Sequence, residues 1–481
     1  MGWYGSGYLL PSCALTLIFG KLYTFFSIKW VYLVALFIFE LGSFVCGIAP
    51  NSIGLIMGRA VAGIGGAGLF SGSVLIVTQT VPLRRRPIYT GMLGAMFGIA
   101  SVAGPLMGGA LTDRASWRWC FYINLPFGAI TALFVMLFFK APKPVKVMHG
   151  WRDLLSELDL PGAFFFLPAV ICGLLALQWG GIKYEWKDTR IIILFVCCGA
   201  FAVFFTIVQV WRQDKATIPP RLIKNRNMMG SAWFAFAIGC CFFIYVYYVS
   251  AIPPWSVIFI LANSLQLPLW FQAVKGASAT KSGIMNLPMI LSVVVVSVIA
   301  GGLVTWLGQY APFMIACSVI MTVGAGMLTI LEPDSNHREW IGYQALFGIG
   351  LGMGIQQPMI VVQTALAAGD VPSATAINSF CQTLGGALFI SVGQNVWSNE
   401  LVKKMTDTVP PLEIAKATNA GATLLRDTVS EEWLPAVLKA YSDAITEAFF
   451  PGVAMGGLSL IGALAVEWIS VRGRKIEMGP V

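Results

Sequence analysis

The sequence predicts an all-α, polytopic membrane protein of about 13 spans, and three observations support this prediction. Of its 481 residues, 57% are hydrophobic and only 11% are charged, and the mean hydropathy is +0.77. So few charges cannot cover so much apolar surface in water. The apolar residues gather in runs of about 20, the length a helix needs to cross about 30 Å of hydrocarbon. These observations exclude collagen, disordered chains, disulfide-rich secreted proteins and ordinary cytosolic enzymes.

The apolar runs give the predicted spans in chain order. They lie at 3–19, 30–49, 53–78, 88–111, 118–139, 160–179, 190–211, 228–248, 284–306, 312–331, 340–364, 375–397 and 445–470. Helices of this length satisfy their backbone hydrogen bonds internally, as the bilayer requires. A further apolar stretch, 251–271, is ambiguous.

The loops between the runs suggest two bundles around a midplane site, an arrangement common among transporters of this size. We predict an N-terminal bundle at 1–139, basic linkers with two central spans at 140–227, and a C-terminal bundle at 228–481. Segment 398–443 is mixed in charge, so we expect an outer loop with a short amphipathic helix near 431–442.

The basic residues are distributed unevenly between alternate loops. One set of loops carries Lys21, Lys29, Arg84, Arg85, Arg86, Lys140, Lys143, Lys146, Arg152, Arg212, Lys215, Arg221, Lys224, Arg226, Arg472, Arg474 and Lys475. The opposite short loops carry fewer, namely Arg114, Arg118, Lys183, Lys187, Arg190, Lys275, Lys281 and Arg338. Cytoplasmic loops are enriched in Lys and Arg, so we expect a cytoplasmic C-terminus and an outside N-terminus. The net charge of +9 therefore reflects topology, and we expect no nucleic-acid partner.

The cysteines and histidines do not suggest metal chemistry. The ten cysteines fall within predicted spans without a CxxC pair, as buried small apolar residues do. The two histidines, His149 and His337, lie in connecting loops. We therefore expect no metal and no cofactor. A membrane-embedded enzyme would need clustered His, Asp or Cys, so we also expect the chain not to be an enzyme.

Two charged residues lie inside predicted spans, where an ionised side chain costs about 2.5–3.5 kcal/mol. Counting along the helices places Glu40 about 15 Å deep and Arg59 about 9 Å from the outer edge. An arginine side chain could bridge this difference in depth. The two residues either form a structural ion pair or take part in coupling to transported protons.

The fourth span is rich in small residues. Its candidate positions are Gly91, Gly94, Gly98, Gly104, Pro105, Gly108 and Gly109. Small residues four apart let a second helix approach closely, and Pro105 removes one backbone hydrogen bond and bends the helix. Close packing alone would explain the glycines, whereas a proline among them is more specific.

These residues resemble the major facilitator superfamily, in particular its fungal fourteen-span drug:proton antiporters, which include mycotoxin efflux pumps. Gly91–Gly109 resembles their antiporter signature G-x8-G-x3-G-P-x2-G-G, with Ala100 at the second glycine. The stretch 55–66, LIMGRAVAGIGG, resembles the family's arginine block, in which the arginine, here Arg59, is associated with proton transfer. The phrases RRRPIYTG and WRWCFYINLP add to a resemblance that covers nearly the whole chain.

Residues 20–29 resemble the family's cytoplasmic gating loop only weakly. Gly20, Leu22 and Lys29 match, but Thr24 takes the acidic position and Ser27 that of a glycine. The chain also begins at what resembles the family's second span, so we expect the first span to be missing. A start codon placed too late would explain this, and a truncated protein is the alternative.

Segment 249–266 departs from the family pattern. Deleting its residues would join Tyr248 to Leu267 and give YYLPLWFQ, which resembles an uninterrupted family phrase. Val249-Ser250 and Gln266 can be encoded by intron boundary sequences, and the length keeps the reading frame. We therefore expect a retained intron here, with a genuine insertion as the alternative.

Neutral polar and aromatic residues inside the spans are candidates for the substrate pathway, because an unpaired amide is unfavourable in hydrocarbon. The candidates are Gln79, Asn124, Gln356, Gln357, Asn378, Gln382, Trp233 and Tyr245, with Gln363 as a further amide. Hydrogen bonding between helices is the alternative for each amide. A lipid-facing or interfacial position is the alternative for the aromatic residues.

We therefore expect a monomeric transporter in contact with membrane lipids that exports a small organic compound in exchange for protons by alternating access. The alternatives are a proton-coupled importer, a facilitator, or a non-functional product of truncation or mis-splicing. The plasma membrane is the expected location, with a vacuolar or other internal membrane as the alternative.

Overall fold

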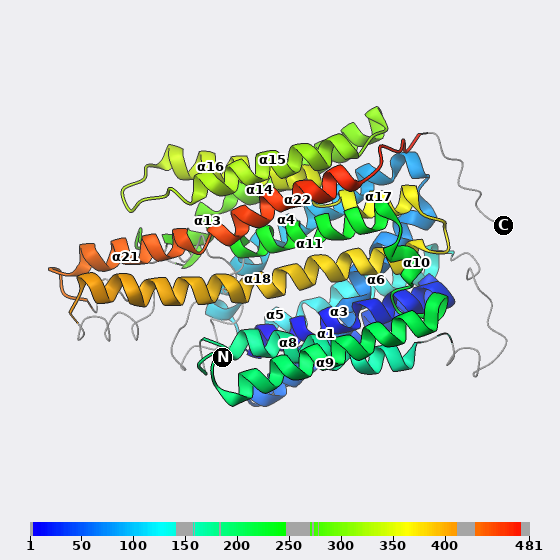
Figure 1. Cartoon of the computed structure of the whole chain (residues 1–481), viewed down its shortest axis with the longest axis horizontal. Helices are drawn as coiled ribbons and strands as arrows, with labels where there is room; N and C mark the ends of the chain where they lie inside the picture. Colours follow the sequence, from blue (N-terminus) through cyan, green and yellow to red (C-terminus); the bar gives the residue numbers. More distant parts are fainter. Residues whose placement is uncertain are drawn as a thin grey trace.

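The computed structural model describes residues 3–140, 157, 159–181, 184–246, 270, 271, 274–277, 279–410 and 429–472. Most of these residues form helices that run along one common axis (Figure 1). Twelve helical segments in this part of the chain are long and apolar enough to cross a membrane. The prediction of an all-α polytopic membrane protein is therefore confirmed. The predicted insertion at 249–266 lies outside the described residues.

The N-terminal half contains six described α-helices. They are α1 (Trp3–Phe25), α2 (Ile28–Ile48), α3 (Ser52–Thr80), α4 (Arg86–Arg114), α5 (Trp119–Tyr122) and α6 (Asn124–Phe138). Asn51 begins α3 because its side chain accepts a hydrogen bond from the Gly54 amide at 2.9 Å. Helices α2 and α3 pack backbone to backbone, since a Cβ at Gly42 or Gly65 would overlap the main chain of the other helix.

Two details of this half differ from the prediction. Residues 20–25 belong to α1, so the expected gating loop is helical except for its short connection to α2. The run 88–111 forms α4, which is not among the twelve segments that meet the length and hydropathy criteria.

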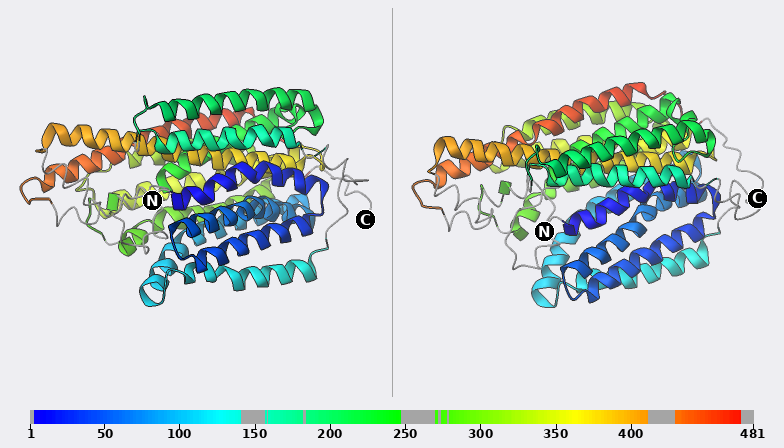
Figure 2. Two further views of the ribbon diagram at one scale, coloured as in Figure 1. Left: turned by 90° about the horizontal axis from the view of Figure 1, so that it is seen from below. Right: turned by 60° about the horizontal axis from the view of Figure 1, so that its bottom comes forward.

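Two central helices, α8 (Leu160–Trp179) and α9 (Thr189–Arg212), pair with each other beside both halves. Figure 2 shows them along the outside of the molecule, next to α1 and α18. Phe166 of α8 stacks edge-on against Phe380 of α18, with 5.2 Å between the ring centroids. A 3-10 turn, η2 (Gln213–Lys215), and the short helix α10 (Pro220–Ile223) then lead to the C-terminal half.

The C-terminal half contains nine described helices. They are α11 (Arg226–Val246), α13 (Ala279–Met285), α14 (Leu287–Leu307), α15 (Ala311–Leu328), α16 (His337–Gly354), α17 (Gln357–Ala365), α18 (Val371–Thr408), α21 (Leu434–Glu447) and α22 (Phe450–Ala465). The span predicted at 340–364 is thus divided between α16 and α17, with Pro358 in the first turn of α17, where a proline is tolerated. The largest hydrophobic cluster of the described residues lies in this half, around Phe234, Tyr245 and Phe347.

The predicted outer loop 398–443 is largely helical where it is described. Helix α18 has 38 residues, or about 57 Å at 1.5 Å per residue, well beyond the about 30 Å of hydrocarbon. Its end and α21 extend together from the bundle as an outer hairpin, on the left in Figure 1. Lys404 lies 3.8 Å from both Asp443 and Glu447, and the Trp397 and Tyr441 rings lie 6.2 Å apart. Because these faces of α18 and α21 pack against each other, α18 continues as a helix beyond residue 397, where the predicted span ends.

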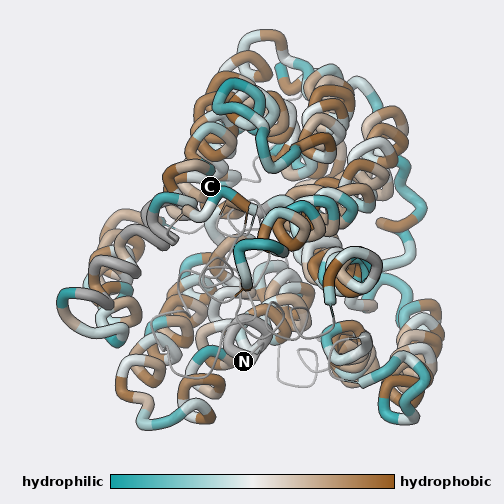
Figure 3. The backbone as a smooth tube through the Cα atoms, turned by 90° about the vertical axis from the view of Figure 1, so that its left-hand side faces the viewer, coloured by the Kyte–Doolittle hydropathy of each residue, from teal (hydrophilic) through white to brown (hydrophobic). Residues whose placement is uncertain are grey.

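The described loops of the more basic set meet at one end of the molecule, which we call the basic end. It contains the connections 26–27, 81–85, 213–225 and 466–472, on the right in Figure 1. Lys29 donates to the Met136 carbonyl at 2.7 Å and Arg226 to the Ala465 carbonyl at 2.5 Å. In Figure 3, apolar residues follow the helices, and hydrophilic ones are common in the connections, as lipid exposure requires.

Candidate functional site

The two halves meet along a seam formed by two helix pairs. The first is α4 against α14, where glycines allow very close approach. A Cβ at Gly91 would lie 2.5 Å from the Ser297 carbonyl oxygen, and one at Gly98 would lie 2.5 Å from a methyl of Val294. The Ser297 hydroxyl donates to the Gly91 carbonyl at 3.2 Å. The first glycines of the signature therefore form a contact between the halves.

The second pair is α1 against α18, close to the basic end. A Cβ at Gly20 would overlap that of Ala376, and the Thr24 and Ser373 hydroxyls lie 3.3 Å apart. Lys21 donates to the Lys215 carbonyl at 3.2 Å. Leu22 packs against a hydrophobic cluster that lies mostly in the N-terminal half and includes Val371 of α18. Residues predicted to form a gating loop thus do lie between the halves, but on a helix.

The remaining signature positions have different surroundings. Gly104 is exposed, and no heavy atom of the described structure lies within 4 Å of a Cβ built there. Gly108 is buried, and its carbonyl accepts a long contact of 3.7 Å from the Cys120 thiol. Helix α4 continues through Pro105 and Gly109, whose side-chain surroundings lie outside the described part of the chain. Among the described positions of the signature, Gly91 and Gly98 make the tight contacts with α14, and Gly104 makes none.

Arg59 lies at the interface of α3 with α1. Its guanidinium carbon is 5.0 Å from the centre of the Tyr8 ring, a distance typical of a cation–π contact. Gly63 and Gly66 make room for Tyr8, since a Cβ at either would overlap it. The sequence analysis did not single out Tyr8. Tyr8 belongs to no motif in the sequence. Only the packing of α1 on α3 places it beside Arg59.

Glu40 lies on the face of α2 that packs against α6. Gly128 of α6 leaves the space that its carboxylate occupies, because a Cβ there would overlap Oε1. The second oxygen, Oε2, is buried without a hydrogen-bond partner. The ion pairs found among the described residues do not include Glu40 with Arg59. The structural ion pair, one of the two interpretations of these residues, is therefore not found in the described part of the chain, because similar depth in the bilayer does not place two residues on facing helix surfaces.

Among the candidate amides, Gln356 lies at the seam. Its Cγ would be 3.1 Å from a Cβ at Gly94, so this side chain of the C-terminal half contacts α4. The neighbouring Gln357 donates to the Met353 carbonyl at 3.0 Å, while its Oε1 is buried without a partner. Gln363 is also buried, and neither of its amide atoms has a hydrogen-bond partner among the residues that the structure describes. Gln356 contacts α4, and Gln357 and Gln363 follow it on α17.

Asn378 and Gln382 lie where α18 packs on α11. The Asn378 amide donates to the Pro358 carbonyl at 2.9 Å and to the Ser231 hydroxyl at 3.3 Å, and so links α17, α18 and α11. The Gln382 carbonyl is so close to α11 that a Cβ at Gly239 would overlap it. For Asn378 the structure favours hydrogen bonding between helices.

The other candidates are scattered. Tyr245 is fully buried between Phe347 and Phe449, each 4.7 Å away, and its hydroxyl reaches two main-chain carbonyls. It is a packing residue in this structure. Trp233 is partly exposed and donates to the Leu458 carbonyl at 2.9 Å. Gln79 is exposed near the end of α3, and the Asn124 amide donates to the Ser43 hydroxyl at 3.2 Å. The structure does not bring these four residues together.

A family model described as Major Facilitator Superfamily matches residues 1–390. The chain belongs to the major facilitator superfamily. It is 57% identical over 472 residues to efflux pump roqT of Penicillium rubens, covering 98% of this chain and 84% of that protein. It is 51% identical over 478 residues to MFS-type efflux pump MFS1 of Trichophyton rubrum, covering 99% of this chain and 86% of that one.

Solved structures show the same fold. The human organic anion transporter MFSD10 matches with a TM-score of 0.56 at 12% identity, over 95% of this chain and 83% of its own. The proton:xylose symporter XylE matches with a TM-score of 0.55 at 14% identity, over 95% of this chain and 84% of its own. The predicted family is therefore confirmed, and the named relatives are fungal efflux pumps.

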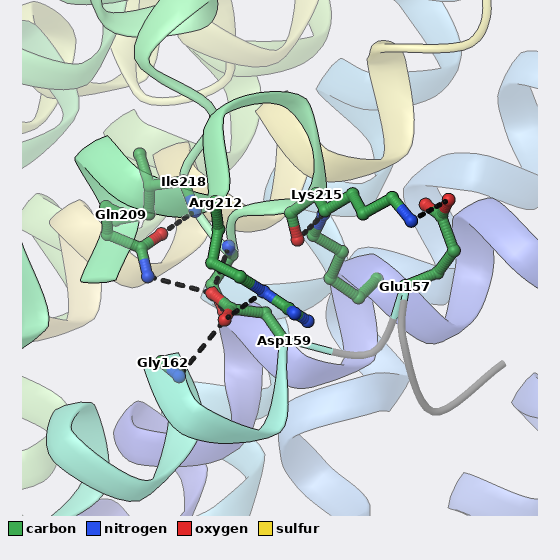
Figure 4. Close-up of polar contacts among 9 residues, drawn as sticks. Glu157, Asp159, Gly162, Gln209, Arg212, Lys215 and Ile218 are labelled. Carbon is green, nitrogen blue, oxygen red and sulfur yellow. Dashed lines mark hydrogen bonds and ion pairs between the residues drawn. The ribbon is translucent and has the colours of Figure 1, made fainter. Parts of the chain in front are cut away.

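This major facilitator contains one polar centre that the sequence analysis missed. Figure 4 shows Asp159, the N-cap of α8, at its middle. Its buried carboxylate accepts hydrogen bonds from the Gly162 amide at 3.1 Å, the Gln209 side chain at 2.8 Å, and the Thr217 amide and hydroxyl at 2.7 and 2.8 Å. Arg212 lies 3.4 Å from it. An acidic residue before a Leu-Pro pair does signal a cap, but its partners lie far along the chain.

We expect Asp159→Ala to destabilise this superfamily member. The substitution would leave several buried donors without an acceptor, at about 1–3 kcal/mol for each donor that water does not reach. A matched control is Asp188→Ala, which removes the N-cap of α9, where, within the described residues, the carboxylate accepts one hydrogen bond, from the Arg190 amide at 2.8 Å. The thermal midpoint in detergent should fall clearly for the first variant and little for the second. Equal midpoints would contradict the assignment of Asp159 as a central acceptor.

Proposed function

We propose that this chain exports a small organic compound in exchange for protons, by alternating access of a central pathway between its two halves. The observation that carries the proposal is the seam. The halves contact each other through Gly20 with Ala376 and through Gly91 with Ser297, and the seam is tightest towards the basic end. The efflux-pump names of relatives that match nearly the whole chain support export.

The basic end would face the cytoplasm, with the C-terminus, since cytoplasmic loops are enriched in Lys and Arg. The plasma membrane is the expected location. In this orientation the seam would close the cytoplasmic side, and cargo would leave on the side of the outer hairpin.

Proton coupling would depend on Arg59 and Glu40 acting separately. Glu40 presents a buried carboxylate oxygen without a hydrogen-bond partner, and such a group can exchange a proton when water reaches it. Arg59 stacks on Tyr8 of α1, the same helix that forms the seam with α18 through Gly20. A change at Arg59 would therefore reach the seam along α1, which contains Pro11 between these two contacts.

The amides of Gln356, Gln357 and Gln363 are our candidates for the cargo pathway. Gln356 contacts α4, the other two follow on α17, and three amide atoms of Gln357 and Gln363 have no partner within the described residues. Unsatisfied buried amides are unfavourable unless water or a ligand supplies the partner.

Transport in reconstituted vesicles tests this proposal. Purified protein would be placed in liposomes with an imposed pH gradient, and a fluorescent lipophilic cation would report transport. We expect the dye to move in the direction opposite to the proton flow. A protonophore should abolish this movement. Movement with the protons would indicate an importer, and movement independent of them would indicate a facilitator. No movement of any dye tested, from well-folded protein, would favour a non-functional product.

The contact between the Thr24 and Ser373 hydroxyls at the seam can be tested as a gate. In the double variant Thr24→Cys with Ser373→Cys, we expect mild oxidation to form a disulfide, because the two hydroxyls lie 3.3 Å apart. Dye export should stop on oxidation and return after reduction, since the bond would hold the halves together. Each single variant is a control that should export under both conditions. Continued export by the crosslinked double variant would show that this contact does not open.

A further inference from the structure

A pocket of about 220 Å³ opens beside the end of α9, near the basic end. Its walls are mostly apolar and include Phe205, Val210, Ile218 and Pro220, and Lys224 lies at its edge. This volume is below the about 300–1,000 Å³ of pockets that enclose drug-sized ligands. It suits part of one hydrocarbon chain.

Polar contacts beneath the pocket determine its shape. The Gln209 side chain accepts from the Ile218 amide at 2.8 Å, and Asp159 accepts from both the amide and the hydroxyl of Thr217. These bonds, shown in Figure 4, fold the segment after α9 back against the helix. The pocket is therefore preformed.

The pocket opens on the outer surface of the helical bundle. At its lining, Thr206, Val210, Ile223 and Lys224 are exposed. On the same helix, Ile207 and Trp211 are 57% and 75% exposed, as expected of a helix that faces lipid. Tryptophan is enriched where the hydrocarbon meets the headgroups. A molecule that enters this pocket would thus come from the membrane, at headgroup depth.

The charge at the mouth favours an anionic headgroup. Lys224 is exposed and takes part in none of the ion pairs found among the described residues. Arg221, also exposed, lies in α10, which ends just before Lys224, and is already paired with Asp214 and Asp370 at 3.3 and 2.8 Å. Basic pockets between spanning helices are known to bind anionic lipid headgroups.

We propose that this pocket holds part of one acyl chain of an anionic phospholipid, whose phosphate faces the Lys224 ammonium. The apolar walls would exclude water from the chain, and the ammonium would select the headgroup. The site lies outside the seam and the candidate cargo pathway, so it does not depend on the proposed function.

The test measures lipid retained by the whole purified chain. Protein in detergent would be mixed with phosphatidylserine or, separately, phosphatidylcholine, and bound lipid would be counted by native mass spectrometry. We expect phosphatidylserine to be retained about tenfold more strongly than phosphatidylcholine, which corresponds to about 1.4 kcal/mol. Lys224→Glu should remove this preference. Lys187→Glu, a charge reversal at an exposed residue at the other end of α9, should not.

A second pair of variants tests the apolar walls. Val210→Trp would fill the pocket and should lower retention of both lipids. Val203→Trp is the matched control, because Val203 is similarly exposed on α9 but does not line the pocket. Equal retention of the two lipids by the unmodified protein would overturn the proposal. It would also be overturned if Lys224→Glu and Lys187→Glu showed the same lipid preference, or if Val210→Trp and Val203→Trp retained equal amounts of lipid. Transport is not the readout, so failure here would leave the proposed function unaffected.

Discussion

Arg59→Ala is expected to abolish proton-dependent export while the protein remains folded in the membrane. The guanidinium lies within a spanning helix, where insertion of a charge costs about 2.5–3.5 kcal/mol, so removing it should not weaken insertion. What would be lost is the charge that contacts Tyr8 at 5.0 Å, at the interface of α3 with the seam helix α1. We expect the proton-driven rate of dye export to fall at least about tenfold, or about 1.4 kcal/mol in activation free energy.

Arg118 offers a matched control for this prediction. Its guanidinium carbon lies 4.5 Å from the Trp117 ring centre, a comparable cation–π contact, but it belongs to the connection between α4 and α5. Arg118→Ala should therefore export at nearly the normal rate. Arg59→Lys separates charge from shape, and partial recovery of proton dependence would indicate that the charge matters. Full proton dependence in Arg59→Ala would remove Arg59 from the coupling mechanism.

Gly91→Ala is expected to cause the second large loss, because one methyl group would separate the halves at the seam. The new Cβ would lie 2.5 Å from the Ser297 carbonyl oxygen, which belongs to the main chain of α14 and cannot turn away. The α4 and α14 helices would have to move apart and lose the Ser297–Gly91 hydrogen bond. We expect export to fall severalfold and the thermal midpoint in detergent to decrease.

Gly104→Ala is the control on the same helix and in the same signature. No heavy atom of the described structure lies within 4 Å of a Cβ at Gly104, so the methyl group meets open space. Alanine is favoured over glycine in a helix by about 1 kcal/mol, so stability should be unchanged or slightly higher. If Gly104→Ala instead abolished export while Gly91→Ala did not, the signature would act at its second half, in another conformation of the transporter.

Much of the fold follows from local properties of the chain. Hydropathy over about 20 residues is enough to locate a spanning helix, because a helix in lipid satisfies its own backbone hydrogen bonds. The loops rich in Lys and Arg were likewise predicted to share one side, and the structure places them at one end. The motifs around Arg59 and Gly91–Gly109 indicated the superfamily, which the family match confirms.

Other features depended on which helix faces meet. The span that begins near residue 375 does not end at 397, because Leu401 and Met405 are buried in the same hydrophobic cluster as Val437 and Tyr441 of α21. Neither segment is apolar enough alone to predict this. Asp159 is recognisable as an N-cap, yet its hydrogen bonds to Gln209 and Thr217 span 50 and 58 residues.

For Glu40 and Arg59, too, one property follows from the sequence and another depends on helix packing. Residue counting along a helix determines depth in the bilayer, because the rise per residue is constant. It does not determine which neighbour a side chain meets, since that depends on how each helix is rotated against the others. The sequence by itself therefore determined the spans, the family and the basic end. Only the tertiary structure decided that Glu40 faces Gly128, that Arg59 faces Tyr8, and that Gly91 rather than Gly104 lies in the seam.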